Sequence, residues 1–169
     1  MRLPATTVTG QGDLAVLLLH GIGGDRTLWA ASETAREIAE AGHRAVAVDL
    51  PGYGDSVDLG PPNMDVFIVA VESLIDHLRA KRIVLLGHSM GGMVAQEVVA
   101  RNPERVQGLV LACTSAAFGQ SGGGWQAQFV EDRLAPLDAG LGMAGMRRGW
   151  CRTWSRRLRQ RRRKRSPVK

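Results

Sequence analysis

The sequence predicts an α/β fold in which a parallel sheet is flanked by helices. Four short runs rich in Val, Leu and Ile lack polar alternation, which is typical of strands buried on both faces of such a sheet. Stretches with helical patterns lie between these runs, so strand and helix alternate along the chain as they do in βαβ units. The expected strands are Leu14–Leu19, Arg44–Leu50, Arg82–Leu86 and Val106–Ala112.

Each expected helix has its own boundary signals. Trp29–Glu40 is rich in Ala and Glu and is followed by Gly42, a common residue after a helix C-terminus. Met64–Leu78 follows a candidate N-cap, Asn63, and repeats apolar residues at helical spacing. Met90–Arg101 directly follows the third strand and stops before an Asn-Pro pair, where a helix normally ends.

The pattern weakens after the fourth strand. Residues 119–124 include four glycines, and Trp125–Leu134 predicts one more helix. We therefore divide the chain into a core at residues 1–117, a linker region at 118–145 and a basic tail at 146–169 that we expect to be disordered.

Composition excludes several classes of protein. Of the 169 residues, 44% are hydrophobic and 22% are charged, as in one soluble globular domain. No apolar run reaches the roughly 18 residues that cross a bilayer, and no signal-peptide pattern is present, so we expect a cytoplasmic protein without a membrane span. The two cysteines form no CxxC pair and no His/Cys cluster, which supports neither a disulfide framework nor a metal site. We expect Cys113 to be a small core residue.

The net charge of +6 averages two unlike segments. Residues 1–145 carry 10 Lys and Arg and all 16 acidic residues, whereas residues 146–169 carry 12 Lys and Arg and no acid. Such a tail fits an unrelated or frame-shifted C-terminus. Alternatively, Trp150, Trp154 and Leu158 recur every four residues between arginines, the spacing of a basic amphipathic helix that could contact nucleic acid or an anionic surface.

The strongest chemical signal is the run Gly87-His88-Ser89-Met90-Gly91. It fits the G-x-S-x-G pattern and lies between an expected buried strand and an expected helix, which is the setting of a nucleophile elbow. The serine would stand at the carboxyl edge of the sheet, close to a helix N-terminus. The alternative is a glycine-rich turn in which Ser89 only caps the helix.

The second signal is His20-Gly21-Ile22-Gly23-Gly24, directly after the first strand. Acyl transfer by a serine needs two backbone N–H groups aimed at the developing oxyanion. One normally belongs to the residue after the nucleophile, here Met90, and the other to the early strand-to-helix loop, which points to Ile22. We expect His20 to brace this loop through hydrogen bonds; the alternative is a plain glycine turn.

Three further motifs are weaker. Residues 119–123 also fit G-x-S-x-G, but they lie beyond their strand in the glycine-rich linker, where a flexible hinge is the favoured interpretation. Ser56 is expected to be a turn residue. Residues 10–12 imitate a dinucleotide fingerprint but precede a strand instead of following one.

Together these residues resemble the α/β-hydrolase family. Leu17–Gly21, Asp49–Ser56, Gly87–Gly92 and Asn102–Val106 occur in the family's order and spacing. The resemblance extends over about residues 12–145 and is closest to small-molecule hydrolases such as 3-oxoadipate enol-lactonases and carbon–carbon bond hydrolases. It implies the N-terminal portion of an α/β-hydrolase fold with the start of a cap region, a serine nucleophile with a histidine base and an acid, a small-molecule substrate, and no cofactor.

One part of the family pattern is missing. The acid and then the histidine should follow the serine, yet all four histidines (His20, His43, His77 and His88) precede Ser89. We therefore expect a truncated hydrolase with an uncovered sheet edge, whose family chemistry, the hydrolysis of an ester, lactone or similar acyl bond, is crippled. The alternative is a non-catalytic protein that binds nucleic acid or anionic surfaces through its tail.

Overall fold

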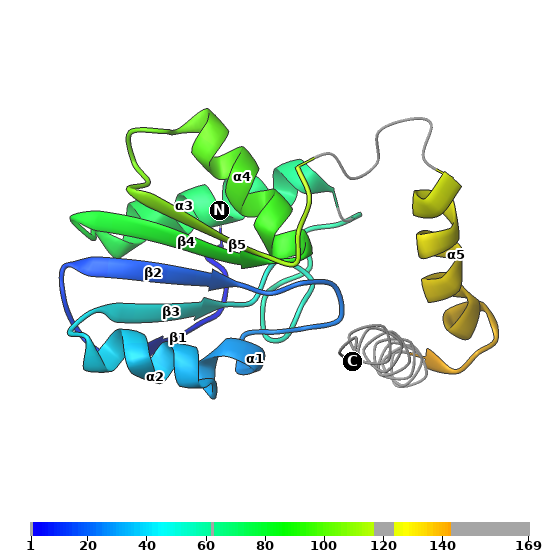
Figure 1. Ribbon diagram of the computed structural model, residues 1–169, viewed down its shortest axis with the longest axis horizontal. Helices are drawn as coiled ribbons and strands as arrows, with labels where there is room; N and C mark the ends of the chain where they lie inside the picture. The colour runs from blue at the N-terminus through cyan, green and yellow to red at the C-terminus, as the bar shows by residue number, and fades with distance from the viewer. Residues whose placement is uncertain (1, 62, 117–123, 143–169) are drawn as a thin grey trace, which may run out of the picture. The chain divides into compact units, whose positions relative to one another are not determined.

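The structure, a computed structural model, describes residues 2–61, 63–116 and 124–142. Its centre is a five-stranded sheet in the order β1-β3-β2-β4-β5 (Figure 1). β2, β3, β4 and β5 run parallel to one another, and β1 pairs antiparallel with β3. The strands are β1 Thr6–Thr9, β2 Leu14–Leu19, β3 Arg44–Val48, β4 Arg82–His88 and β5 Gly108–Ala112.

The four parallel strands confirm the predicted α/β class, with boundaries shifted by two residues at β3, β4 and β5. β1 was missed. It is a four-residue edge strand made mostly of threonine, so it has no continuous apolar run that would reveal it in the sequence.

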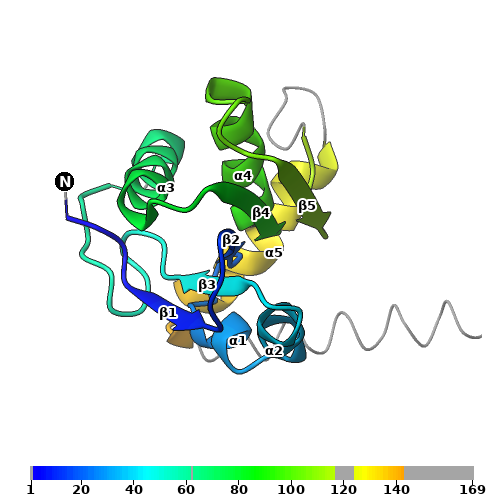
Figure 2. The ribbon, with the colours of Figure 1, turned by 90° about the vertical axis from the view of Figure 1, so that its left-hand side faces the viewer.

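Helices cover both faces of the sheet, as Figure 2 shows. α3 Met64–Leu78 and α4 Met90–Arg101 lie on one face, and α1 Thr27–Ala30 and α2 Glu33–Glu40 lie on the other. The predicted bounds of α3 and α4 are confirmed, and Asn63 caps α3 by accepting a hydrogen bond from the Val66 N–H.

The single helix predicted over Trp29–Glu40 is wrong. The chain forms two helices here because Ser32 takes an extended conformation and its Oγ accepts a hydrogen bond from the Ala35 N–H, which starts α2 anew.

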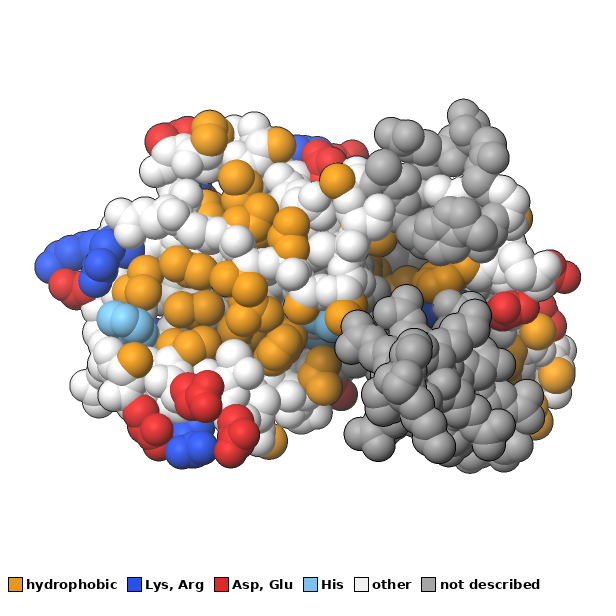
Figure 3. Space-filling view, in the orientation of Figure 1, with side chains coloured by type: hydrophobic (Ala, Val, Ile, Leu, Met, Phe, Trp, Pro, Cys, Tyr) orange, Lys and Arg blue, Asp and Glu red, His pale blue; other side chains and the backbone are white. Residues whose placement is uncertain are grey.

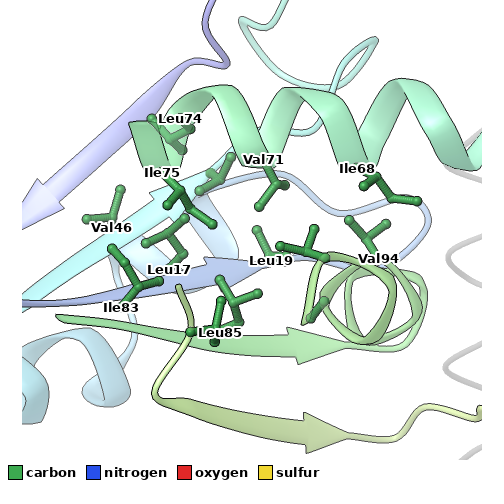
Figure 4. Packing of buried hydrophobic residues seen from close by; sticks show 14 of the residues in the cluster. Leu17, Leu19, Val46, Ile68, Val71, Leu74, Ile75, Ile83, Leu85 and Val94 are labelled. Atoms are coloured by element: carbon green, nitrogen blue, oxygen red, sulfur yellow. The ribbon is translucent and has the colours of Figure 1, made fainter. Parts of the chain in front are cut away.

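The principal hydrophobic core lies between the sheet and the pair α3 and α4 (Figure 4). Leu17, Leu19 and Leu85 reach it from the strands, and Val71 and Val94 reach it from the two helices. All five are fully buried, and each such side chain contributes about 1.5–3 kcal/mol through removal from water. This packing fixes the junction of β4 and α4, where Ser89 lies.

Burial on both faces holds for β2 and β3 but not for β5. In the described part of the sheet β5 is an edge strand, with Val110 49% and Leu111 44% exposed. Hydrophobic side chains also gather on the face of the molecule over the sheet in Figure 3.

The chain divides into two compact units, Met1–Ala116 and Ala117–Lys169. In the second unit, α5 Gly124–Asp138 confirms the helix predicted over Trp125–Leu134 and extends beyond it. The second G-x-S-x-G motif at 119–123 and the basic tail at 146–169 lie outside the described residues. Within the described ranges, no helix has the length and apolar character needed to cross a bilayer.

Candidate active site

Ser89 lies in the sharp turn between β4 and α4. Its backbone has φ 53° and ψ −117°, a region that a residue with a side chain rarely occupies, and such a conformation costs about 1–3 kcal/mol. Its side chain makes no capping hydrogen bond to α4, so the alternative in which Ser89 only caps the helix is not what the structure shows. The hydroxyl is therefore free of the helix it precedes.

Glycines around Ser89 allow the elbow to form. A Cβ on Gly87 would overlap the backbone of Gly91, and a Cβ on Gly91 would lie 2.5 Å from the Leu19 carbonyl oxygen. A Cβ on Gly92 would come within 2.7 Å of the Thr114 side chain. The elbow is thus packed directly against the end of β2 and the segment after β5.

The segment after β5 holds the Ser89 backbone from two sides. The Ser89 N–H donates to the Ala112 carbonyl at 2.9 Å, and the Thr114 hydroxyl donates to the Ser89 carbonyl at 2.7 Å. Between these two residues, Cys113 has a positive φ of 51°. Thr114 was not predicted from the sequence, because nothing in its local pattern marks it as a partner of the elbow.

The glycine loop after β2 lies against this elbow. A Cβ on Gly21 would be 2.9 Å from the Ser89 Cβ, which places the loop beside the nucleophile candidate. The Gly24 N–H donates to the Gly21 carbonyl at 3.1 Å and Gly23 has φ 74°, so Gly21–Gly24 form a tight turn that needs glycine at its third position.

The two amides expected to bind an oxyanion are both available. Neither the Ile22 N–H in this turn nor the Met90 N–H at the start of α4 donates a hydrogen bond to a described residue. The first turn of α4 contains no acidic residue, so the positive end of the helix dipole is not neutralised there. Such an environment favours a developing negative charge near Ser89.

His20 braces the loop, as the sequence predicts. It is fully buried, its Nε2 accepts a hydrogen bond from the Leu50 N–H at 3.1 Å, and its Nδ1 lies 2.9 Å from the Gly21 carbonyl. These partners require a neutral ring with the proton on Nδ1. Burial lowers the pKa of His20, which also favours the neutral form. The Tyr53 ring packs against it at 4.8 Å between centroids.

Asp49, which the sequence marks only as part of a motif, is a fully buried carboxylate directly after β3. It accepts a hydrogen bond from the Asp55 N–H at 2.8 Å, while a Cβ on Gly54 would overlap it. Ser56 donates to the Asp49 carbonyl at 2.7 Å and accepts from the Ala5 N–H at 2.8 Å. Ser56 is therefore a turn residue, as expected.

None of the described histidines has the position and the free ring nitrogen that a base for Ser89 would need. His43 precedes β3 and His77 lies in the last turn of α3 before β4, so both lie at the amino edge of the sheet, opposite Ser89. His20 uses both ring nitrogens as a brace. His88 is the immediate neighbour of Ser89, and its buried Nδ1 has no hydrogen-bond partner among the described residues.

The acidic residues after Ser89 are not placed to serve as the acid of a catalytic triad either. Glu97 lies on the exposed side of α4, and Glu104 lies in the turn that leads into β5, at the amino edge. The other three belong to α5. The structure thus places Ser89 and Met90 beside the glycine turn that contains Ile22 but, in its described part, shows no acid or base beside them.

Cys113 corrects an expectation. Instead of a small core residue it is an exposed free cysteine, because the chain leaves the sheet at this point with a positive φ. In the described ranges, no group of three or more His, Cys, Asp or Glu side chains is arranged to hold a metal ion.

A largely parallel sheet with a strained serine between β4 and α4, facing a glycine turn after β2, defines the class of α/β hydrolases. The model of the family described as "alpha/beta hydrolase fold" matches residues 15–165, and the chain belongs to this family. The matched range extends past residue 145 and includes most of the basic segment.

Curated relatives support the same family. The chain is 42% identical over 105 residues to 2-hydroxy-6-oxononadienedioate/2-hydroxy-6-oxononatrienedioate hydrolase of Escherichia coli (strain K12), covering 60% of this chain and 36% of that protein. It is 38% identical over 113 residues to the dihydrolipoyllysine-residue acetyltransferase component of the acetoin cleaving system of Pseudomonas putida, covering 66% and 30%. The chain spans about a third of the length of these relatives.

Solved structures of two esterases superpose on this chain. An esterase from Exiguobacterium antarcticum superposes with a TM-score of 0.73 at 25% identity, covering 86% of this chain and 55% of that one. A thermophilic esterase from Thermogutta terrifontis superposes with a TM-score of 0.65 at 34% identity, covering 78% and 46%.

Proposed function

We propose that this chain carries the nucleophile half of a serine hydrolase site that acts on an ester, lactone or similar acyl bond of a small molecule. The observation that carries this proposal is the strained backbone of Ser89, which holds its hydroxyl free of α4 beside an unneutralised helix N-terminus. Strain of this kind persists only where the surrounding structure enforces it, and it concentrates at functional sites.

In the proposed reaction Ser89 Oγ attacks the acyl carbonyl and loses its proton to solvent, and the N–H groups of Ile22 and Met90 stabilise the oxyanion. Collapse of the oxyanion breaks the acyl C–O bond, the leaving alcohol takes up a proton, and water then hydrolyses the acyl-serine. Both amides lack another acceptor in the described structure, and the Ile22 turn packs on the elbow through Gly21. Similarity to proteins named as hydrolases and esterases supports this class of reaction.

We propose further that the 169-residue chain, tested alone, reacts slowly. All of its histidines precede Ser89, and none is placed to take its proton in the geometry described above. Loss of the base from such a triad costs about 10⁴–10⁶ in rate, while the oxyanion donors retain part of the catalysis.

A fluorophosphonate probe tests both statements. We expect slow covalent labelling of the wild-type chain that is absent in Ser89→Ala. Fast labelling lost in Ser89→Ala would contradict the slow rate and require a base elsewhere in the chain. Labelling that persists in Ser89→Ala would contradict the assignment of the nucleophile.

The charge of the tail favours a second candidate, binding of nucleic acid or of anionic surfaces. Residues 146–169 carry 12 basic and no acidic residues. Retention on DNA that weakens with salt and is lost on deletion of residues 146–169 would support this function, because phosphate binding releases counterions. Retention that is absent or insensitive to salt would exclude it.

A further inference from the structure

The loop that carries Ile22 is attached at both ends to the segment that follows β3. At its start, His20 Nε2 accepts the Leu50 N–H. At its end, the Arg26 N–H donates to Asp49 Oδ1 at 2.6 Å. We infer that Arg26 and Asp49 are positioning residues that fix the Ile22 amide as an oxyanion donor; this inference rests on the proposed function.

The Arg26 side chain ties three segments together. Its guanidinium forms an ion pair with Asp49 and a second one with Asp55, and its Nε donates to the Thr7 hydroxyl on β1 at 3.2 Å. These hydrogen bonds, first with Asp55 and then with Asp49, raise the pKa of Arg26. The planar guanidinium can serve both carboxylates at once, which a lysine ammonium does less well.

Burial of Asp49 makes this attachment hard to release. Its side chain is fully buried, whereas the Arg26 side chain is 21% exposed. Its oxygens accept from the Arg26 and Asp55 N–H groups and from the guanidinium. If Arg26 moved away, a buried carboxylate would lose its charge partner, which is strongly unfavourable. The end of the loop therefore stays where Asp49 holds it.

The attachment matters for catalysis because of the position of Ile22. This residue lies two positions after His20 and four before Arg26, in the turn closed by the Gly24 N–H. With both ends held, the turn stays against Ser89 at Gly21. A donor displaced by about 1 Å can cost about 100-fold in rate, so the anchors determine whether the Ile22 amide contributes.

The test must separate local positioning from general stabilisation. We compare Arg26→Gln and Arg26→Lys with a matched control, Arg105→Gln, which removes the ion pair between Arg105 and Asp76 of α3, away from the loop. The readouts on the full chain are the ¹⁵N order parameters of Ile22 and Gly24, stability in urea, and the rate at which a fluorophosphonate labels Ser89.

We expect Arg26→Gln to lower the order parameters of Ile22 and Gly24 from about 0.85 to below about 0.6, with those of β2 and β4 unchanged. Labelling of Ser89 should slow about 10-fold or more, and Arg26→Lys should restore part of both values. Arg105→Gln should change stability alone. Unchanged order parameters in Arg26→Gln, or equal labelling rates in Arg26→Gln and Arg105→Gln, would overturn the inference.

The proposed function and the positioning role of Arg26 can be contradicted independently of each other. If the wild-type chain shows no labelling at Ser89, the proposed function is contradicted and the order parameters alone decide whether Arg26 positions the loop.

Discussion

Gly21 and Ser89 are in such close contact that a Cβ on Gly21 would lie 2.9 Å from the Ser89 Cβ. The same Cβ would be 3.1 Å from His88 Nδ1. The glycine of the loop after β2 is therefore required by the neighbouring elbow, and any larger residue must separate the loop from Ser89.

This contact predicts the effect of Gly21→Ala. The added methyl group should push the Ile22 turn away from the elbow, which lowers stability by about 1–3 kcal/mol through overpacking and slows labelling of Ser89. Urea unfolding and fluorophosphonate labelling measure the two effects. Gly124→Ala is the control, because a Cβ at Gly124 meets no atom within 4 Å. Equal labelling of Gly21→Ala and wild type would show that the loop tolerates the displacement.

Ser56 and Ser89 should respond in opposite ways to replacement by alanine. Ser56→Ala removes the acceptor of the Ala5 N–H and the donor to the Asp49 carbonyl, so it should cost about 1–3 kcal/mol of stability. Its labelling by a fluorophosphonate should match that of wild type. Loss of labelling in a folded Ser56→Ala chain would move the nucleophile to Ser56.

His20 should make stability depend on pH near neutrality. Its pKa is lowered in the folded state by burial, from a value of 6.5, so below pH 6.5 the unfolded chain binds a proton that the folded chain does not. Its contribution is therefore complete above pH 6.5 and is lost as the pH falls, by at most about 1.4 kcal/mol per pH unit.

Urea unfolding of wild type and His20→Asn measures this contribution. Measurements between about pH 7.5 and pH 5 span the range in which a histidine of ordinary pKa titrates. The stability difference between the two proteins should shrink as the pH falls. Asp13 and Asp25, whose pKa values are lowered from 3.8 by hydrogen bonds with Lys81 and Thr27, act only at lower pH. A difference that stays constant across this range would contradict the burial of His20 as a neutral ring.

The sequence was sufficient for the elements that bury continuous apolar runs. β2 and β3 are hidden on both faces, so their composition alone marks them, and the elbow follows from its glycines and its position between a strand and a helix. β1 was not predictable in this way because its stability comes from pairing with β3, 36 to 42 residues further on.

The contacts of the site that were not predicted join residues that are far apart in the sequence. Arg26 and Asp49 are 23 residues apart, and Thr114 and Ser89 are 25 residues apart, so no local spacing reveals either pair. One signal was available for the first pair: an acidic residue that directly follows a fully buried strand needs a partner. Nothing comparable marks Thr114, since a hydroxyl is common at the end of a strand.

Thr114 holds the Ser89 turn from the segment after β5. Its hydroxyl donates to the Ser89 carbonyl at 2.7 Å, and this oxygen also accepts from the Gly92 and Met93 N–H groups at 3.0 and 3.2 Å. Thr114→Val keeps the shape that packs on Gly92 and removes only the donor, so it should lower stability by about 1 kcal/mol. The strained Ser89 backbone then loses one of the bonds that hold it, and labelling should slow.

Thr114→Ser separates the hydrogen bond from the packing of the methyl group. It keeps the donor, so labelling should return toward the wild-type rate even if stability does not, while Thr9→Val on β1 serves as a threonine control outside the site. Equal labelling of Thr114→Val and wild type would show that the Ala112 carbonyl and the glycines hold the elbow without Thr114. If labelling is slower in Thr114→Val and returns toward the wild-type rate in Thr114→Ser, the segment after β5 helps to hold the nucleophile turn.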